Sequence, residues 1–218
     1  MANRNAPNTK DRTLDAFKGR MIGGGARPNL FECELYFPDD AIPEGTTKDA
    51  LTDRTRFMVK AANLPASNIS PINIPFRGRI LKVAGDRTFD PWTITVINDT
   101  NFKLRNAFER WMNFINRHDD NAGVITPAAY QTEMVVHQLG RGNEVNGTNG
   151  QLPDNGAKIP VLKSYKFFGT FPTNVSPIEL SYDAADSVEE FTVDLQVQWW
   201  DALDPASGTS ILGTSETT

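Results

Sequence analysis

The stretch from Arg79 to Asp99, RILKVAGDRTFDPWTITVIND, constrains the fold of this chain more than any other. Leu81 and Val83 fall on one side of an extended backbone, and Gly85-Asp86 has the composition of a tight turn. Two sets of side chains then alternate, as in a half-buried strand. One set is apolar, Trp92, Ile94 and Val96, and the other is mostly threonine, Thr93, Thr95 and Ile97. The stretch therefore predicts a strand, a turn and a second strand, which makes a sheet the basis of the fold.

The same alternation recurs along the chain and predicts further strands at 29–37, 54–61, 130–139, 160–168, 178–183 and 191–199. A structured turn is expected at 169–175. The side chains expected to face the core are Phe31, Cys33, Leu35 and Phe37 in the first of these strands, Phe57 and Val59 in the second, and Phe191, Val193, Leu195, Val197 and Trp199 in the last.

A hairpin is expected at residues 72–84, so that its second arm overlaps the start of the stretch from Arg79 to Asp99. It consists of an extended apolar run, a turn and a returning strand: Ile72, Ile74 and Phe76, then Arg77-Gly78-Arg79, then Ile80 to Ala84. Pro71 and Pro75 have no backbone N–H, so the first arm is not expected in the middle of a compact sheet. It belongs at an edge, or in a pairing with another subunit, because an uncovered edge invites aggregation.

One long helix is expected from about residue 101 to 117, after the capping side chains of Asn98 and Asp99. Its apolar residues recur at helical spacing and form one stripe for packing on the sheet: Leu104, Phe108, Trp111, Met112 and Ile115. A short helix at 11–18 would place Leu14 and Phe17 on one face.

The chain of 218 residues, 39% of them hydrophobic, has the size of one large β domain. We expect an N-terminal arm at 1–27, the domain at 28–200 and a flexible C-terminal tail at 201–218. Stretches rich in Gly, Pro and polar residues predict long loops at about 38–53 and 140–158. Together the elements predict a mainly β fold, an antiparallel β-sandwich or barrel with one flanking α-helix.

Composition excludes several classes of protein. The net charge of -5 and the pI of about 5.1 argue against binding nucleic acid with the whole surface, which needs surplus lysine and arginine. Cys33 is the only cysteine, so no internal disulfide is possible, and its apolar neighbours predict an inert thiol. No run of about 18 apolar residues occurs, so neither a spanning helix nor a signal peptide is expected.

Catalytic and metal-binding patterns are weak. His118 and His137 are too far apart to predict a zinc site on their own. Asp86 with Asp90, or Asp119 with Asp120, would be the acid and base of a glycosidase, but an aspartate in a turn ordinarily bonds local backbone amides. We therefore expect no enzyme, no cofactor and no metal.

Several short motifs resemble the tail tube protein of contractile-tailed (myovirus) bacteriophages over roughly residues 26 to 200. They are Ala26-Arg27-Pro28-Asn29-Leu30-Phe31, Leu64-Pro65, Val83 to Asp90 followed by Trp92, Pro172-Thr173-Asn174-Val175 and Trp199-Trp200. The most specific is the run Ala84 to Phe89 with the tryptophan downstream of it. The residues of this predicted motif turn are Gly85, Asp86, Arg87, Phe89, Asp90 and Trp92. The loops at 38–53 and 140–158 and the tail after Asp201 are longer than that family leads one to expect.

The resemblance implies a tail-tube fold, shared with type VI secretion tube proteins, and a structural role. Hexameric rings would stack into a hollow tube inside a contractile sheath, with a baseplate and a tail terminator as further partners. DNA would pass through the lumen without specific binding. The subunit would belong to the virion tail, be assembled in the host cytoplasm and not insert into a membrane. The alternatives are a type VI secretion-like or baseplate tube-initiator subunit, and a carbohydrate-binding or carbohydrate-active β-sandwich.

Within such a ring the hairpin would join strands of neighbouring subunits into a closed lumen barrel, since closure removes edges. The residues expected at this joint are Ile72, Ile74, Phe76, Arg77, Arg79 and Lys82. Cations facing the lumen would hold phosphates and slow the DNA. We therefore expect most of them to pair with acids of adjacent subunits or to lie at ring junctions, which leaves a neutral or acidic channel.

Overall fold

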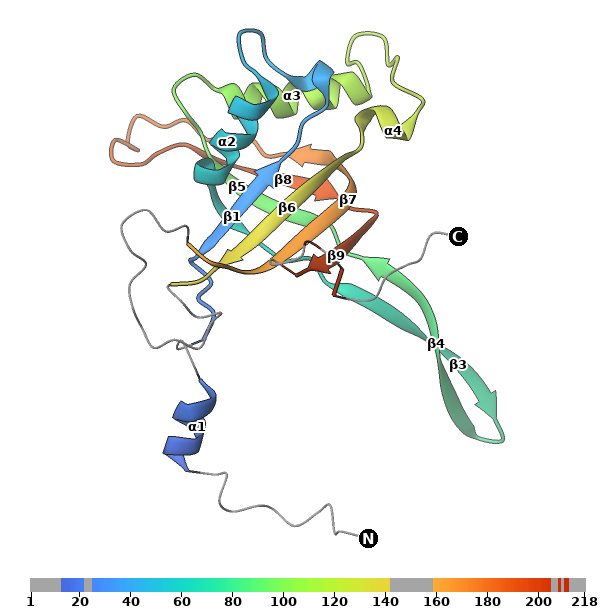
Figure 1. The fold of residues 1–218 in the computed structure, drawn as a ribbon. Helices are drawn as coiled ribbons and strands as arrows, with labels where there is room; N and C mark the ends of the chain where they lie inside the picture. Colours follow the sequence, from blue (N-terminus) through green and yellow to red (C-terminus); the bar gives the residue numbers. More distant parts are fainter. Residues whose placement is uncertain (1–12, 22–24, 142–158, 205–207, 209, 212–218) are drawn as a thin grey trace.

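Seven strands form one antiparallel sheet that wraps around the core (Figure 1). The structure is a computed structural model, and it describes residues 13–21, 25–141, 159–204, 208, 210 and 211. The order is β1-β6-β7-β8-β5-β2, with β9 also paired to β7. Their bounds are Phe31–Leu35 (β1), Val59–Ala62 (β2), Trp92–Ile97 (β5), Thr132–Leu139 (β6), Val161–Val175 (β7), Glu190–Gln196 (β8) and Trp199–Leu203 (β9).

Strand β7 connects the two halves of this sheet. Its first part pairs with β6 and β9, and its last residues pair with β8. Gly169 has a φ of 62° just before the change of partner, and a Cβ there would lie 2.5 Å from the Gln198 side chain. The predicted turn at 169–175 is therefore part of a long strand, in which a glycine supplies the unusual backbone conformation.

The alternating residues identified in the sequence form the core. Trp92 stacks on Phe167 with ring centroids 4.6 Å apart. The apolar side chains of β1, β5, β6 and β8 close around them, all nearly inaccessible to water: Cys33, Leu35, Ile94, Val96, Met134, Val136, Phe191, Val193 and Leu195. Burial raises the pKa of the Cys33 thiol to about 12, in keeping with the inert thiol predicted.

Three helices gather at one end of the sheet (Figure 1): α2 (Lys48–Met58), α3 (Lys103–Ile115) and α4 (Pro127–Tyr130). Helix α3 is the predicted long helix, and Asp99 Oδ1 accepts a hydrogen bond from the Lys103 amide at its start. Leu104, Phe108 and Trp111 are buried, whereas Met112 and Ile115 at the end of the stripe are half-buried. The stripe thus packs on the core, mainly through the rings around Phe37.

Helix α2 corrects two predictions. The expected loop at 38–53 contains a short helix, η3 (Asp39–Ala41), and the first half of α2, and the expected strand at 54–61 is mostly the second half of α2. Phe57, predicted to face the core, is 78% exposed, and only Val59 is buried. Two threonines of α2 explain the position of the helix: Leu35 N–H donates to Thr55 Oγ1 and Thr52 Oγ1 donates to the Leu35 carbonyl, so α2 satisfies the open edge of β1.

Three further expectations are wrong. No strand forms at 178–183, where Leu180 and Tyr182 are exposed. The last predicted strand breaks after Gln196, and Trp199 is 45% exposed in β9, which continues to Leu203 in the predicted tail. Tyr130 ends α4 and does not begin β6.

The predicted segments at both ends and the second long loop are only partly described. The short helix of the arm is α1 (Leu14–Arg20), and it buries none of its residues. Residues 142–158 of the predicted second loop lie outside the described residues, as do 1–12 and 22–24 of the arm and 205–207, 209 and 212–218 of the tail.

Candidate assembly interface

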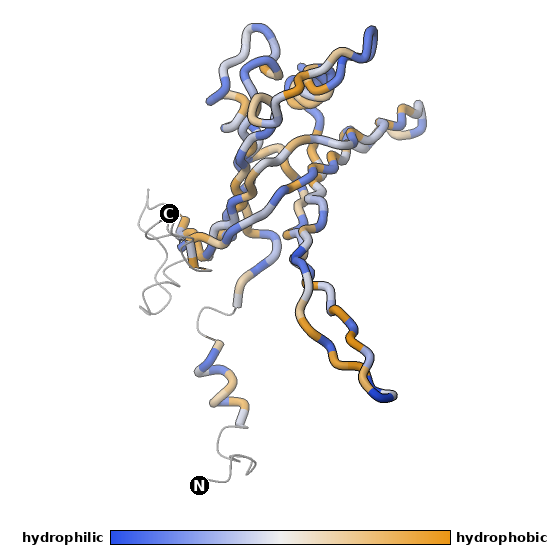
Figure 2. Tube along the Cα trace, turned by 90° about the vertical axis from the view of Figure 1, so that its right-hand side faces the viewer, coloured by the Kyte–Doolittle hydropathy of each residue, from blue (hydrophilic) through white to orange (hydrophobic). Residues whose placement is uncertain are grey.

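The predicted hairpin projects from the body as two strands, β3 (Ser67–Phe76) and β4 (Arg79–Phe89), that pair only with each other (Figure 1). Every residue of β3 is exposed, and on β4 only Gly85 and Phe89 are half-buried. Figure 2 shows apolar residues along both strands and a hydrophilic tip. Apolar side chains that are this exposed among the described residues form a surface suited to a partner.

The apolar side chains share one face of the hairpin. Ile72 lies opposite Val83, Ile74 opposite Leu81 and Phe76 opposite Arg79, and cross-strand partners point to the same side of a sheet. We call Ile72, Ile74, Phe76, Leu81 and Val83 the apolar face; each is between 43% and 66% exposed. Arg79 is the cation on this face, while Lys82 points to the other side.

The two edges of the hairpin differ in their ability to add another strand. Arg77 and Gly78 have φ values of 44° and 82°, as in a two-residue type I′ turn, so Phe76 and Arg79 exchange the closing hydrogen bonds. Hydrogen-bonded and non-hydrogen-bonded pairs then alternate along the ladder. The outward positions on β3 are consequently Pro71, Asn73 and Pro75, and those on β4 are Ile80, Lys82 and Ala84. Prolines have no N–H, so β3 has a blunted edge, whereas the edge of β4 keeps all its donors.

The motif residues form the base of the hairpin. Gly85 and Asp86 lie within β4, so their prediction as a turn is wrong; the glycine faces a register shift at Ser70. A Cβ on Gly85 would lie 2.5 Å from the Ser70 carbonyl oxygen, so close backbone approach requires glycine.

The remaining motif residues tie the hairpin to the body. Asp90 N–H donates to the Ala66 carbonyl, and Asp90 Oδ1 accepts from the Asn68 amide. The Phe89 ring lies 6.2 Å from the Trp200 ring, and Trp92 is in the core. These contacts anchor the start of β3 and the end of β4, while the rest of the hairpin stands free.

The hairpin is also basic. Arg77, Arg79, Lys82 and Arg87 are accompanied by a single acid, Asp86. The Arg77 guanidinium lies 5.4 Å from the centre of the Phe76 ring. Among the described residues no carboxylate forms an ion pair with any of the four cations, so each is available to an acid from another molecule.

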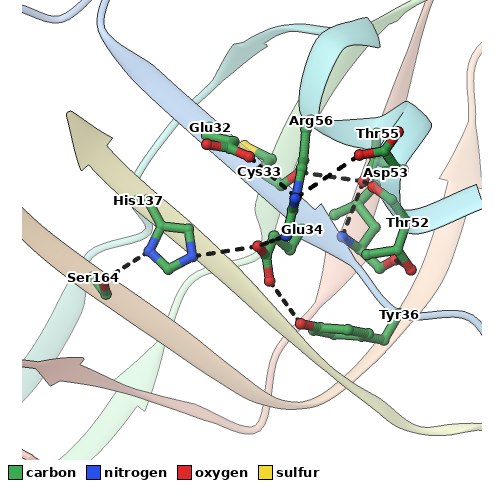
Figure 3. Close-up of polar contacts among 11 residues, drawn as sticks. Glu32, Cys33, Glu34, Tyr36, Thr52, Asp53, Thr55, Arg56, His137 and Ser164 are labelled. Carbon is green, nitrogen blue, oxygen red and sulfur yellow. Dashed lines mark hydrogen bonds and ion pairs between the residues drawn. The ribbon is translucent and has the colours of Figure 1, made fainter. Parts of the chain in front are cut away.

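A second polar cluster surrounds Glu34 on the outer side of the sheet (Figure 3). Tyr36 OH donates to Glu34 Oε2 over 2.6 Å, and Arg56 bonds Glu34 over 2.5 Å and Glu32 over 3.1 Å. Burial alone would raise the pKa of Glu34, but the hydrogen bonds from Tyr36 and Arg56 lower it below its usual value. The cluster therefore fastens α2 to β1.

The same cluster contains the order Ser164, His137, Glu34, which resembles a nucleophile, a base and an acid. His137 Nδ1 lies 2.7 Å from Ser164 Oγ, and His137 Nε2 lies 3.7 Å from Glu34. Ser164 is only 5% exposed, and both glutamate oxygens already accept hydrogen bonds from Tyr36 and Arg56. The arrangement links β7, β6 and β1 and does not present a hydroxyl to a substrate.

The other sequence candidates for chemistry have local partners or stand apart. His118 Nδ1 contacts Asn113, and Asp119 and Asp120 both pair with Arg117. Asp86 is exposed on β4. Within the described ranges no three His, Cys, Asp or Glu side chains are arranged to hold a metal ion, and no described helix has the length and apolar character to cross a membrane.

Comparison with known proteins decides between the functions left open by the sequence. The family model for phage tail tube proteins matches residues 26–202, which include the hairpin, its base and all of the sheet except Leu203, the last residue of β9. The chain belongs to the phage tail tube protein family. Tail tube protein gp19 of Enterobacteria phage T4 is 30% identical over 187 residues, covering 86% of this chain and 98% of that protein. The tail tube protein of Serratia phage KSP90 is 29% identical over 186 residues, covering 84% and 93%.

Solved structures show that tail tube proteins share this fold with parts of other contractile systems. A chain in the cryo-EM structure of the anti-feeding prophage baseplate has a TM-score of 0.54 at 12% identity, covering 83% of this chain and 97% of that one. A chain in the sheath/tube terminator of the PVC extracellular contractile injection system has a TM-score of 0.51 at 9% identity, with the same coverage. The predicted mainly β fold and tail tube identity are confirmed, and the protein is a structural tube subunit.

Proposed function

We propose that this tail tube subunit forms hexameric rings that stack into a hollow conduit inside a contractile sheath, through which the phage genome is delivered. The observation that carries the proposal is the hairpin, whose apolar face is exposed and whose only edge with a full set of donors is that of β4. The hairpin joins neighbouring subunits, and the β4 edge, not the proline-blunted β3 edge, receives the added strand. Obligate contacts of this kind commonly bury on the order of 2,000 Å² or more.

The partners follow from the same proposal. Chains of this fold occur in structures described as a baseplate, a sheath/tube terminator and a sheath-tube complex of contractile systems. By analogy the tube here contacts a sheath protein, a baseplate and a tail terminator. The subunit is part of the virion tail, is assembled in the host cytoplasm, and acts as a passive conduit, not as an enzyme.

The charge of the chain supports passage of DNA without specific binding. The net charge is -5, and the described cations outside the hairpin include Arg54, Arg56 and Lys60, each paired with an acid of the body. If the hairpin cations pair with acids of neighbouring subunits, they add no surplus positive charge to the lumen that would hold phosphates.

Negative-stain electron microscopy tests the proposal. Purified protein at rising concentration, with and without added salt, is expected to form rings or hollow tubes with six-fold end views. The same protein should also lengthen tube fragments taken from phage tails, which covers assembly that needs a template. A particle that stays monomeric at every concentration and does not extend such fragments would contradict the proposal.

A further inference from the structure

The loop between β7 and β8, residues 176–189, is held to the body near its two ends by Ser176 and Glu189, and its middle is a second exposed surface. Leu180, Tyr182 and Val188 are between 67% and 107% exposed. Between them lie Asp183 and Asp186, with Glu179 just before, and none of these acids forms an ion pair with a described residue. The loop therefore combines unpaired acids with uncovered apolar side chains.

The loop and the hairpin are complementary in both respects. The hairpin has an apolar face and unpaired cations, and Arg79 lies on that face. No lysine or arginine follows Lys166 in the sequence, so nothing in the C-terminal part of the chain itself can neutralise the acids of the loop. An apolar surface bearing unpaired cations and one bearing unpaired acids fit each other both by burial and by charge.

The two surfaces cannot meet within one molecule. Figure 1 shows the hairpin leaving the body on one side and the loop between β7 and β8 projecting on the opposite side. A contact between them must therefore join two copies, with the hairpin of one against the loop of the next. Such a head-to-tail contact leaves one free hairpin and one free loop at the ends, so it repeats until a ring closes or a filament grows.

We propose that the loop 176–189 of one subunit docks on the apolar face of the β3–β4 hairpin of the adjacent subunit, with the acids of the loop paired to Arg79 and its neighbouring cations. This inference rests on the proposed assembly and names the surface that receives the hairpin. It leaves the β4 edge free for strand addition, because the loop covers the face of the hairpin and not its edge.

A second acidic segment, 39–53, is a poorer fit. Asp39 pairs with Lys48, and Asp53 lies 3.8 Å from Arg56. Its large apolar residues, Ile42 and Leu51, are half-buried and buried in their own chain, so it offers little apolar surface to a hairpin. Glu44 in this segment is exposed and acidic, which makes it a matched control position.

Disulfide mapping tests the contact directly, because the only native cysteine, Cys33, is fully buried. A variant with Leu81→Cys on the apolar face is mixed with a size-tagged variant carrying Tyr182→Cys in the loop, and the mixture is oxidised during assembly. We expect a covalent heterodimer whose cross-linked peptides contain both positions. Leu81→Cys mixed with Glu44→Cys is the control and is expected to give none.

Charge exchange gives an independent readout. Arg79→Glu alone is expected to abolish rings and tubes, and Arg79→Glu combined with Asp183→Lys and Asp186→Lys is expected to restore them. Arg79→Glu combined with Glu44→Lys is expected to remain unassembled. Far-UV circular dichroism of each monomer checks that the body is folded, which is expected because the exchanged residues are exposed.

The outcomes separate this inference from the proposed function. Rings or tubes that form without a hairpin-to-loop cross-link would overturn the docking contact and leave the conduit standing. A heterodimer that forms where no ring or tube appears would support the contact and contradict the tube. If the wild type does not assemble, and the cysteine pair neither assembles nor forms a cross-link, the docking contact and the conduit are both overturned.

Discussion

At the scale of single residues, Gly85 decides where the hairpin lies. An alanine there would place its Cβ 2.5 Å from the Ser70 carbonyl oxygen and 3.0 Å from Ile72, so one strand must move. Because the free part of the hairpin makes no core contact, Gly85→Ala should change the stability of the monomer by less than about 1 kcal/mol. The critical concentration at which Gly85→Ala assembles should be higher than that of the wild type. Sedimentation of tubes measures this concentration.

Gly45→Ala is the opposite control for that prediction. A Cβ at Gly45 meets no atom within 4 Å, but the φ of 73° strains any other residue by about 1 kcal/mol or more. This variant should lose stability in urea while its monomers, once folded, assemble normally. If Gly85→Ala lowered stability and Gly45→Ala lowered assembly, the role assigned to Gly85 would be wrong.

The Tyr36–Glu34 hydrogen bond predicts how stability depends on pH. Burial and this hydrogen bond raise the pKa of Tyr36 to about 12, above the ordinary value of 10.0, so the stability it contributes is complete below pH 10 and is lost as the pH rises toward 12. The pKa of Glu34 is lowered, so its contribution is complete above its usual value of 4.5 and is lost in more acidic solution.

Tyr36→Phe removes this bond. The variant should be less stable at pH 7 by about 1 kcal/mol, and the difference from the wild type should shrink as the pH rises from 10 to 12. Urea unfolding at a series of pH values measures both effects. Tyr182→Phe, at a fully exposed tyrosine, is the matched control and should behave as the wild type. A constant difference across the alkaline range would argue against the bond.

At the scale of elements, the β4 edge carries a prediction of its own. Lys82 and Asn73 are directly opposite each other at a non-hydrogen-bonded pair, so proline at either position removes an outward N–H and no bond within the hairpin. Lys82→Pro should abolish tubes in electron micrographs, because the edge that receives a strand loses its central donor. Asn73→Pro on the blunted edge should still assemble, as should Lys82→Gln, which tests the charge alone. Equal loss in both proline variants would show that the edges do not differ.

The elements also show which parts of the fold follow from sequence pattern. Strands β1, β5, β6 and β8 and helix α3 bury a regular apolar set, and their periodicity predicts them. Helix α2 has one fully buried apolar residue, Leu51, and holds the β1 edge through Thr52 and Thr55. It therefore lacks the apolar stripe from which a helix is predicted. The local pattern that indicates the start of α2 is its N-cap residue Thr47, whose hydroxyl accepts a hydrogen bond from the Ala50 backbone N–H.

The candidate interface is partly predictable from sequence, because some of its features depend on local patterns. The turn at Arg77-Gly78 and the edge prolines are local signals, so the hairpin and its exposed residues follow from sequence. The sequence wrongly predicts a turn at Gly85, because sequence alone does not distinguish a glycine needed for close backbone approach from one needed for a positive φ. Residues 178–183 alternate like a strand, but alternation gives no strand where no neighbouring strand lies beside the segment. The exposure of the loop 176–189 is evident only in three dimensions.

At the scale of the whole molecule, a basic hairpin and an acidic loop, residues 176–189, project on opposite sides of the body (Figure 1). The hairpin is basic, and the chain after Lys166 contains acids but no lysine or arginine. Attraction between opposite surfaces of neighbouring copies speeds their encounter, and salt screens it over roughly 10 Å at 0.1 M ionic strength. The apolar contacts that hold a finished tube are not screened in this way.

Added salt should therefore slow the assembly of new tubes but leave finished tubes intact. Raising the NaCl concentration is expected to lower the initial rate of light scattering from fresh monomers, whereas tubes assembled beforehand keep their length in electron micrographs. In Arg79→Gln the rate should be lower at low salt and should depend less on salt, because one of the attracting charges is absent. Assembly that proceeds at the same rate at every salt concentration, or tubes that dissolve as soon as salt is added, would mean that the division of charge does not guide the approach of one subunit to the next.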